Sequence, residues 1–304
     1  MAIHWVAFDF YYLLDISRLL PHIAAIEACQ EAASTRVVPP PWREQPLPAP
    51  TQPPATEVSA APPSDPRQID IRKGLLQNRN ASPAHAWVKE RFNPDSPPIS
   101  IADILAMHRM VAEEAGVRRI DSGGWRKSGF PVYVGRPEVG GIHLGAPENR
   151  LPALMDRYIR FVEGESLRRL PAVIHALVAH FFFTTIHPFE DGNGRVSRLV
   201  SAAILFQRGY HGHGLHALSS HFYQRDIKYH TLLHKCWQQP LPFDLTEFVA
   251  FGIEGLALEL QGINRFIKIK LHRGAERSIW EPDTDMPETG VATIARDDLD
   301  RNGY

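Results

Sequence analysis

The chain has 304 residues, 44% of them hydrophobic, and its 33 basic and 34 acidic residues give a formal net charge of -1 at pH 7. That is enough apolar material for a sizeable core, and a near-neutral chain has no global attraction to nucleic acid or to an anionic membrane. We therefore expect no nucleic-acid partner and no membrane partner. The two cysteines, Cys29 and Cys236, show neither a disulfide framework nor a metal-binding spacing.

The first twenty residues are apolar but carry Asp9 and lack a basic start, which is not typical of a signal peptide. The best apolar run, VIHALVAHFFFTTI at 173–186, is shorter than a membrane span and contains two histidines. It indicates a buried helix. We expect a cytoplasmic protein, with export as an effector lacking a removable signal kept as the alternative.

The N-terminal part divides into a helical segment and a linker. Residues 14–33 carry an apolar stripe of helical period, and 39–66 hold 11 of the 26 prolines, which is typical of an extended linker. We expect an N-terminal helical segment at 1–38, a Pro-rich linker at 39–67, a domain at 68–270 and a polar tail at 271–304.

The domain at 68–270 has mostly helical patterns. Ser100 with Asp103 forms a capping box before one helix, and Gly116 marks its end. Further helical patterns occupy 151–163, 170–184, 195–208, 218–236 and 243–269. Residues 129–147 differ, because PVYV and GIHL flank a turn typical of a β-hairpin. We expect an all-α fold with one short hairpin.

A glycine-containing loop precedes the helical pattern at 195–208. Gly192 and Gly194 let main-chain N–H groups approach an anion, and the helix N-terminus adds about half a positive charge. An ordinary turn is the alternative. Arg195 and Arg198 lie three residues apart in the first turn, where cations are unfavourable unless an anion bridges them. Pairing with Glu190 or Asp191 is the other explanation.

The residues before the glycines supply an acid-base group and a metal ligand. Asp191 is positioned to bind Mg²⁺, which takes one or two carboxylates together with phosphate oxygens. His187 precedes Pro188, so a helix ends beside it, and a histidine there can accept a proton from an attacking hydroxyl. We expect Phe189 to pack into the core and Glu190 to face solvent.

The segment from His187 to Arg198 resembles the signature of Fic (Fido-fold) proteins, His-Pro-Phe-x-Asp-Gly-Asn-Gly-Arg-x-x-Arg, at every fixed position. The similarity extends over about 68–270. HFFFTTIHPF is similar to the family's buried helix, and GGWRKSGFPVYVG to its Gly-x-x-Arg segment and target-docking hairpin. RDIKYHTLL resembles Arg-x-x-Tyr-Tyr-x-x-Leu, with Lys228 replacing the first Tyr and Tyr229 keeping the second.

The resemblance implies a protein adenylyltransferase with a Fic/Fido-type helical bundle, which transfers AMP from ATP to a Ser, Thr or Tyr hydroxyl of a target protein. It implies that His187 is the general base, that Asp191 binds Mg²⁺ and that Tyr229 borders the nucleobase. The hairpin at 130–136 would align the target by strand addition. The implied phosphate-binding residues are Gly192, Asn193, Gly194, Arg195 and Arg198, the last holding the γ-phosphate.

Many members of the family also carry an inhibitory Ser/Thr-x-x-x-Glu-Gly/Asn motif. Glu148, Glu163 and Glu254 are followed by Gly or Asn, but none has Ser or Thr four residues earlier. PPPWREQ at 39–45 resembles the entry to an N-terminal inhibitory helix. Three explanations remain: no inhibition within the chain, a separate inhibitory protein, or a diverged motif.

Four alternatives to adenylyl transfer stay open. A Doc-like kinase carries Lys where this chain has Gly194, which argues against phosphorylation. Transfer of UMP or of phosphocholine uses the same loop, and a non-catalytic interaction module would not need His187 and Arg198. The fourth is a metal site in YHGHGLH, at His211, His213 and His216, where a solvated loop is the better interpretation because no carboxylate or cysteine accompanies them.

Overall fold

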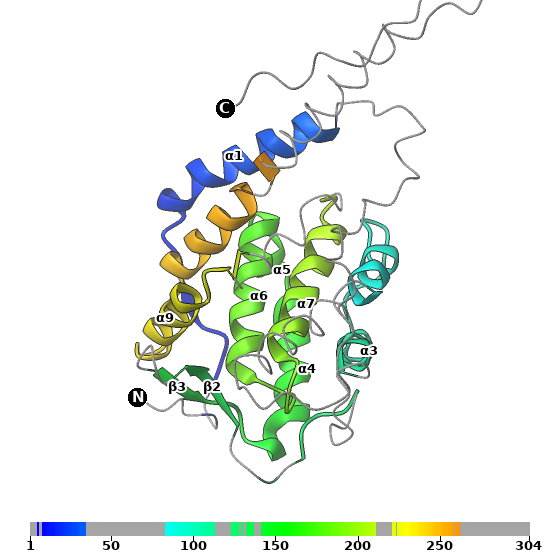
Figure 1. Ribbon diagram of the computed structural model, residues 1–304, viewed down its shortest axis with the longest axis vertical. Helices are drawn as coiled ribbons and strands as arrows, with labels where there is room; N and C mark the ends of the chain where they lie inside the picture. The colour runs from blue at the N-terminus through cyan, green and yellow to red at the C-terminus, as the bar shows by residue number, and fades with distance from the viewer. Residues whose placement is uncertain are drawn as a thin grey trace, which may run out of the picture. The chain divides into compact units, whose positions relative to one another are not determined.

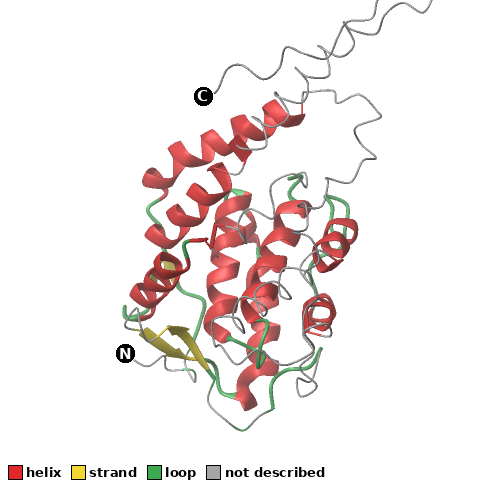
Figure 2. Cartoon of the chain, viewed as in Figure 1, coloured by secondary structure: helices red, strands yellow, loops and turns green. Residues whose placement is uncertain are grey.

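Helices dominate the part of the chain that the computed structural model describes (Figure 2). The described residues are 5, 8–34, 83–112, 123–127, 129, 132–136, 141–210, 221–222, 224–258 and 260–261. The chain divides into two units, Met1–Asn264 and Arg265–Tyr304, and every described residue belongs to the first. The expected linker at 39–67 and tail at 271–304 lie outside the described residues, so the domain boundaries stay a prediction.

The all-α class with one antiparallel hairpin is confirmed (Figure 1). The helices with defined bounds are α1 Ile16–Ser34, α3 Ile101–Ala112, α4 Leu151–Val162, α5 Glu165–Arg168, α6 Ala172–Ile186, α7 Asn193–Gln207, α9 Asp226–Trp237 and the 3₁₀ turn η4 Glu148–Arg150. Residues 83–91 and 246–258 are helical as well. Among the described helices, none is both long and apolar enough to cross a bilayer.

The start of α3 is the predicted capping box. The Ser100 hydroxyl accepts a hydrogen bond from the Asp103 amide at 3.2 Å, and the Asp103 carboxylate accepts one from the Ser100 amide at 2.9 Å. These reciprocal bonds satisfy helix-end N–H groups that have no acceptor within the helix. The cap fixes the beginning of a helix that lies beside the candidate site.

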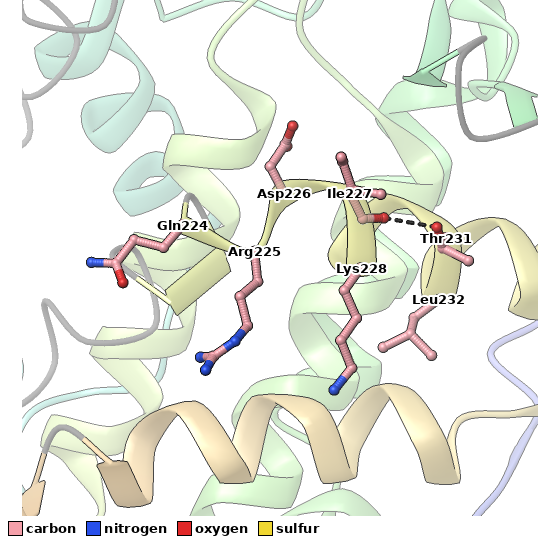
Figure 3. A pocket seen from close by; sticks show the side chains of 7 residues that line it. All are labelled: Gln224, Arg225, Asp226, Ile227, Lys228, Thr231 and Leu232. Atoms are coloured by element: carbon pink, nitrogen blue, oxygen red, sulfur yellow. Dashed lines mark hydrogen bonds between the residues drawn. The ribbon is translucent and has the colours of Figure 1, made fainter.

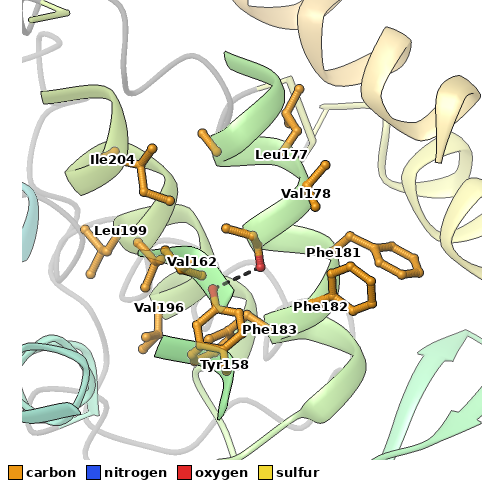
Figure 4. Close-up of a cluster of buried hydrophobic side chains, with 14 of the residues drawn as sticks. Tyr158, Val162, Leu177, Val178, Phe181, Phe182, Phe183, Val196, Leu199 and Ile204 are labelled. Carbon is orange, nitrogen blue, oxygen red and sulfur yellow. Dashed lines mark hydrogen bonds between the residues drawn. The ribbon is translucent and has the colours of Figure 1, made fainter. Parts of the chain in front are cut away.

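Helix α6 forms the centre of the core. All fifteen of its residues are buried, which matches its uniformly apolar sequence, and it packs along α7 (Figures 1 and 4). The Tyr158 hydroxyl of α4 donates to the Ala179 carbonyl of α6 at 3.0 Å, so a buried polar group is satisfied. The C-terminus of this rigid helix leads directly into the loop at 187–192.

A second, parallel strand pair was not predicted. Strand β1 Tyr12–Leu13 pairs with β4 Phe243–Asp244, so the helix expected from residue 243 begins at 246 instead. The Asp15 amide donates to the Thr246 hydroxyl at 2.9 Å beside this pair. Buried Leu19, Ile23 and Ile26 attach α1 to the common core. The N-terminal segment is therefore part of the packed structure.

The predicted hairpin consists of β2 Tyr133–Arg136 and β3 Gly141–Leu144, with Val134 opposite His143. Both side chains of that pair are buried, whereas Tyr133 and Leu144 on the other face are exposed. The His143 ring stacks on Trp237 of α9, with the ring centroids 4.5 Å apart. One face of the hairpin is thus packed against the helices and the other is left to solvent. The predicted docking range begins at 130, but 130–131 lie outside the described residues.

Candidate active site

His187 ends α6 in a left-handed conformation, with φ 55° and ψ 62°. Its amide donates to the Phe183 carbonyl at 3.0 Å, and Nδ1 lies 3.3 Å from the Thr184 carbonyl. Because a carbonyl oxygen only accepts hydrogen bonds, this contact assigns the ring proton to Nδ1. The lone pair of the neutral ring is then on Nε2, where a proton can be taken up.

Burial lowers the pKa of His187 to about 4, with smaller contributions in the same direction from Arg126 and His143. The Thr184 hydrogen bond and the Asp191 carboxylate act in the opposite direction. The imidazole is therefore neutral at pH 7. A neutral ring with a free lone pair can accept a proton, which is the property expected of a base at this position.

The loop after His187 is held by its own asparagine. Asn193 is buried; its Oδ1 accepts from the Phe189 amide at 2.9 Å and its Nδ2 donates to the Phe189 carbonyl at 2.7 Å. Phe189 is itself fully buried, as predicted. The Asn193 side chain is thus occupied within the loop, and only its main chain is left for a ligand.

Helix α7 begins after Gly192, which has φ 85°, a value that suits glycine. No side chain in the described part of the chain caps this helix, so the amides of its first turn are open to a ligand. A Cβ added to Gly194 would lie 3.3 Å from Nη1 of Arg198, a tight contact. The glycines therefore give a ligand access to main-chain donors next to a guanidinium.

The two arginines of the loop differ in their partners. Arg195 pairs with the Asp191 carboxylate at 3.2 Å and donates through Nη1 to the Val111 carbonyl at 2.9 Å. Asp191 thus provides the internal partner considered above, but only for Arg195. No carboxylate of the described residues pairs with Arg198, although burial lowers the pKa of its guanidinium. Arg198 is the cation available to an anion.

A pocket of about 240 Å³ collects these groups. It is lined by His187, Glu190, Asp191, Gly192, Asn193, Gly194, Arg195 and Arg198. The predicted site residues between His187 and Arg198 therefore meet at one place. The Glu190 side chain is exposed, as expected.

The pocket offers one carboxylate suited to a metal. The Asp191 side chain is 40% exposed, and among the described residues no cluster of three or more metal-binding side chains occurs. One accessible carboxylate fits Mg²⁺, which commonly completes its octahedron with waters and substrate phosphates. It does not fit a metal held entirely by protein. The histidines His211, His213 and His216 lie outside the described residues.

Tyr229 does not line this pocket. Its ring is buried, and its hydroxyl lies 2.9 Å from Nε2 of His180. Burial raises the pKa of Tyr229 to about 12, while nearby Arg198 acts to lower it. Tyr229 thus lies near Arg198 but outside the pocket lining, and its predicted contact with a nucleobase stays a prediction.

The three glutamates examined for an inhibitory role are engaged elsewhere. Glu163 accepts from the Ile99 amide at 2.9 Å, Glu254 pairs with Lys228 at 3.6 Å, and Glu148 accepts from the Gly129 amide at 2.8 Å. None of them contacts Arg198 within the described structure. This agrees with the absence of the inhibitory motif at these positions.

His108 of α3 is a supporting residue that the sequence did not reveal. Its ring stacks on Phe189 with centroids 3.7 Å apart, and Nε2 lies 3.2 Å from the Asp191 carbonyl. Nδ1 accepts from the Gly123 amide at 3.0 Å, so the ring proton is on Nε2 and is donated to Asp191. A polar residue on the buried face of a predicted helix was the available signal.

A larger, more open groove of about 700 Å³ lies on the first turns of α9 (Figure 3). Arg225, Lys228 and Leu232 point toward the helix at 246–258 in Figure 3, and Asp226 and Ile227 point away from it. None of the residues from His187 to Arg198 lines this groove, whereas Arg225 and Lys228 of the RDIKYHTLL segment do. We therefore place the candidate active site in the smaller pocket, where the reactive groups are.

Comparison with known proteins agrees with the motif. The Fic/DOC family model matches residues 98–205. Proteins named "Protein adenylyltransferase Fic" from Drosophila erecta and Drosophila melanogaster are 38% identical over 112 residues, which is 37% of this chain and 21% of each relative. The chain thus matches about a fifth of the length of these curated relatives.

Two solved structures share the fold. One is a Fic family protein from Desulfovibrio desulfuricans, with a TM-score of 0.50 and 22% identity, covering 82% of this chain and 66% of that one. The other is Fic-1 from C. elegans, with a TM-score of 0.54 and 16% identity, covering 84% and 74%. These two structures show a shared fold. The family model's match to residues 98–205, together with the complete signature from His187 to Arg198, shows a Fic/DOC domain in that segment.

Proposed function

We propose that this chain is a Fic-type transferase that moves AMP from ATP to a hydroxyl group of a target protein. The observation that carries the proposal is the composition of one pocket. It combines a neutral histidine, helix amides that no described side chain caps, and Arg198, with which no carboxylate of the described residues pairs. The name of the Drosophila relatives supports the adenylyl group in particular.

In the proposed reaction the target hydroxyl attacks the α-phosphorus of ATP. A bond forms between that oxygen and phosphorus, and the bond from phosphorus to the bridging oxygen breaks, so pyrophosphate leaves with the electron pair. The hydroxyl proton goes to Nε2 of His187, the ring position that Nδ1 bonding to Thr184 leaves free. The α7 amides stabilise negative charge on the phosphate oxygens, as preorganised donors do in other sites.

Arg198 is proposed to bind the terminal phosphates, since a guanidinium fits phosphate oxygens with two parallel hydrogen bonds. Asp191 would hold Mg²⁺, which supplies charge neutralisation to the triphosphate when bound. Arg195 is already attached to Asp191 and to α3, so we assign it mainly to fixing that carboxylate and the phosphate-binding turn.

The target is proposed to dock on the hairpin β2–β3. Among the described residues, each strand of this two-stranded sheet pairs along one edge only, and an extended peptide can add to the other edge by main-chain hydrogen bonds. The end of β3 lies next to the base, because a Cβ on Gly145 would be 3.1 Å from the Cβ of His187. A peptide on the hairpin would therefore present its hydroxyl near His187. We also propose that any inhibition of the transfer reaction comes from a separate protein.

The test is transfer of label from ATP with Mg²⁺ present, using the purified chain and a cell lysate. Above a blank of lysate without the chain, label should pass to protein from α-³²P-ATP but not from γ-³²P-ATP, and His187→Ala should abolish this chain-dependent labelling. His234→Ala, which alters a histidine on α9 outside the pocket, is the matched control and should transfer normally.

Other results would redirect the proposal. Label from γ-³²P-ATP alone would indicate phosphorylation, and label from α-³²P-UTP but not ATP would indicate uridylyl transfer. Labelling by His187→Ala at the wild-type rate would refute the assigned base. No transfer from any nucleotide would favour a non-catalytic interaction module.

A further inference from the structure

Arg126 is a buried cation outside the pocket lining. It is 4% exposed, and its nearest carboxylate contact is Glu148 Oε1, 4.0 Å from Nη1. Burial lowers the pKa of the guanidinium, and the charges of Glu148 and Glu190 act against that. A buried charge without a close ion pair requires other partners, and these are main-chain carbonyl groups.

The carbonyls that Arg126 contacts belong to two different segments. Nε donates to the His187 carbonyl at 3.0 Å, and Nη2 donates to the Ala146 carbonyl. The Arg126 amide also donates to the Pro188 carbonyl at 3.1 Å. One side chain thus connects the end of α6 with the residues that directly follow β3.

The same two segments also contact each other. The Ala146 amide donates to the Ile186 carbonyl at 2.9 Å, and the His143 Nε2 lies 3.0 Å from the Thr185 carbonyl. Gly145 approaches His187 so closely that a Cβ would lie 3.1 Å from the histidine Cβ. The end of α6 and the end of β3 are therefore already in close contact. The length of the Arg126 side chain, which bonds to both, sets the distance between these two segments.

His187 needs such support because of its backbone. Among the described residues it is the one non-glycine residue with a positive φ, and such conformations persist only where the surroundings hold them. The contact with the Thr184 carbonyl orients the His187 ring. The hydrogen bond from Arg126 holds the His187 main-chain carbonyl. Both the side chain and the main chain of the base are thereby fixed.

We propose that Arg126 is a positioning residue that locks the base His187 to the target-docking hairpin. The inference rests on the proposed transfer reaction, in which the hairpin carries the hydroxyl and His187 takes its proton. Arg126 sets the distance between these two partners. It is not a phosphate ligand, because it does not line the pocket and its guanidinium is bound to carbonyls on both sides.

The test uses Arg126→Lys and Arg126→Gln, with Lys127→Gln as the matched control. Lys127 is the neighbouring cation and its side chain is exposed. Neither Lys nor Gln can reach both carbonyls, so both variants should lower kcat and raise KM for the protein target, with kcat/KM falling about 10- to 100-fold. The Kd of a non-hydrolysable ATP analogue should change less than about twofold, since that ligand binds at the α7 end.

A readout that needs no activity separates this inference from the proposed function. Hydrogen exchange should accelerate at the amides of Gly145 and Ala146, which donate to Val132 and Ile186, in both Arg126 variants but not in Lys127→Gln. If the wild type transfers nothing, the reaction is wrong and exchange still tests the lock. Arg126→Lys keeps the buried charge and serves if Arg126→Gln does not fold.

Three results would overturn the lock. One is unchanged exchange at Gly145 and Ala146 in both Arg126 variants. Another is an equal weakening of nucleotide and target binding, which would indicate general damage to the site. The third is a Lys127→Gln variant as impaired as Arg126→Gln, because the inference requires the contacts that Arg126 itself makes with the His187 and Ala146 carbonyls.

Discussion

The two ends of the candidate pocket are held by different parts of the molecule. At the end where we propose that the nucleotide binds, α3 contacts the loop: His108 contacts Phe189 and the Asp191 carbonyl, and the Val111 carbonyl accepts from Arg195. At the end that contains His187, the contacts come from Arg126, which precedes the hairpin, and from His143 of β3. These two residues bind carbonyl groups within residues 185–188. The first group of contacts positions the charged side chains of Asp191 and Arg195. The second group positions the main chain around His187. Nucleotide binding and target transfer should therefore respond to separate substitutions.

The largest effect on nucleotide binding is expected from Asp191→Asn. An opposite charge at about 4 Å is worth roughly 4 kcal/mol near a protein surface, so losing it should weaken Mg²⁺-dependent ATP-analogue binding on the order of 1,000-fold. Calorimetry with Mg²⁺ and with EDTA measures this. Wild-type affinity should rise with Mg²⁺, and Asp191→Asn affinity should not.

Glu190→Gln is the control for Asp191→Asn, because it removes the adjacent carboxylate, which is exposed at the pocket rim. It should keep the Mg²⁺ dependence. If Glu190→Gln abolished that dependence while Asp191→Asn retained it, the metal ligand would be assigned to the wrong residue.

A smaller effect is expected from His108. His108→Phe keeps the stack on Phe189 but loses the hydrogen bonds to Asp191 and Gly123, each worth about 1 kcal/mol, so nucleotide affinity should fall by up to about 30-fold. His108→Ala also loses the stack and the packing, and should reduce the free energy of unfolding by about 3 kcal/mol. Analogue titration and urea unfolding measure the two quantities.

Met107→Ala distinguishes loop positioning from loss of core packing. Met107 is fully buried on the same helix, so its truncation should reduce stability by about 2–5 kcal/mol without changing analogue Kd in the folded protein. Equal losses of affinity in Met107→Ala and His108→Phe would show that α3 acts through its packing alone. The hydrogen bonds of His108 would then have no specific role in nucleotide binding.

Helix signals in the sequence predicted most of the helices that surround the site. The capping box at Ser100 and the apolar run leading to His187 predicted α3 and α6, because caps and periodicity are local properties. Strand β1 was missed, since two residues carry no alternation and the partner, β4, is more than 200 residues away. Its pairing depends on tertiary packing that local patterns do not contain.

The supporting contacts of the site were beyond the sequence for a different reason. His108 and Arg126 act on carbonyl groups, and every residue has a carbonyl, so no residue type marks the partner. His187, Asp191 and Arg198 were found because their chemistry is in their side chains, and the glycines because their lack of a side chain exposes the main chain. Tyr229 is the intermediate case: it was identified as part of a motif, but its hydroxyl contacts buried His180 instead of the pocket.

The smallest expected effect concerns the hairpin side and pH. Burial lowers the pKa of His143 to about 4, below the value of about 6.5 for an unfolded chain. Between those values the unfolded state binds a proton that the folded state does not, so the free energy of unfolding decreases as pH falls from about 6.5 to 4. One such group contributes about 1.4 kcal/mol per pH unit.

His143→Phe keeps an aromatic ring against Trp237 and removes this titration. Urea unfolding at pH 7, 6 and 5 should therefore give a slope smaller than the wild-type slope by about 1.4 kcal/mol per unit. The remaining slope should persist, because burial also lowers the pKa of His175 and His187 to about 4. Parallel stability curves would mean that His143 is protonated in the folded hairpin. The hairpin would then carry a charge beside His187, and its side of the pocket would hold the base by electrostatics as well as by backbone contacts.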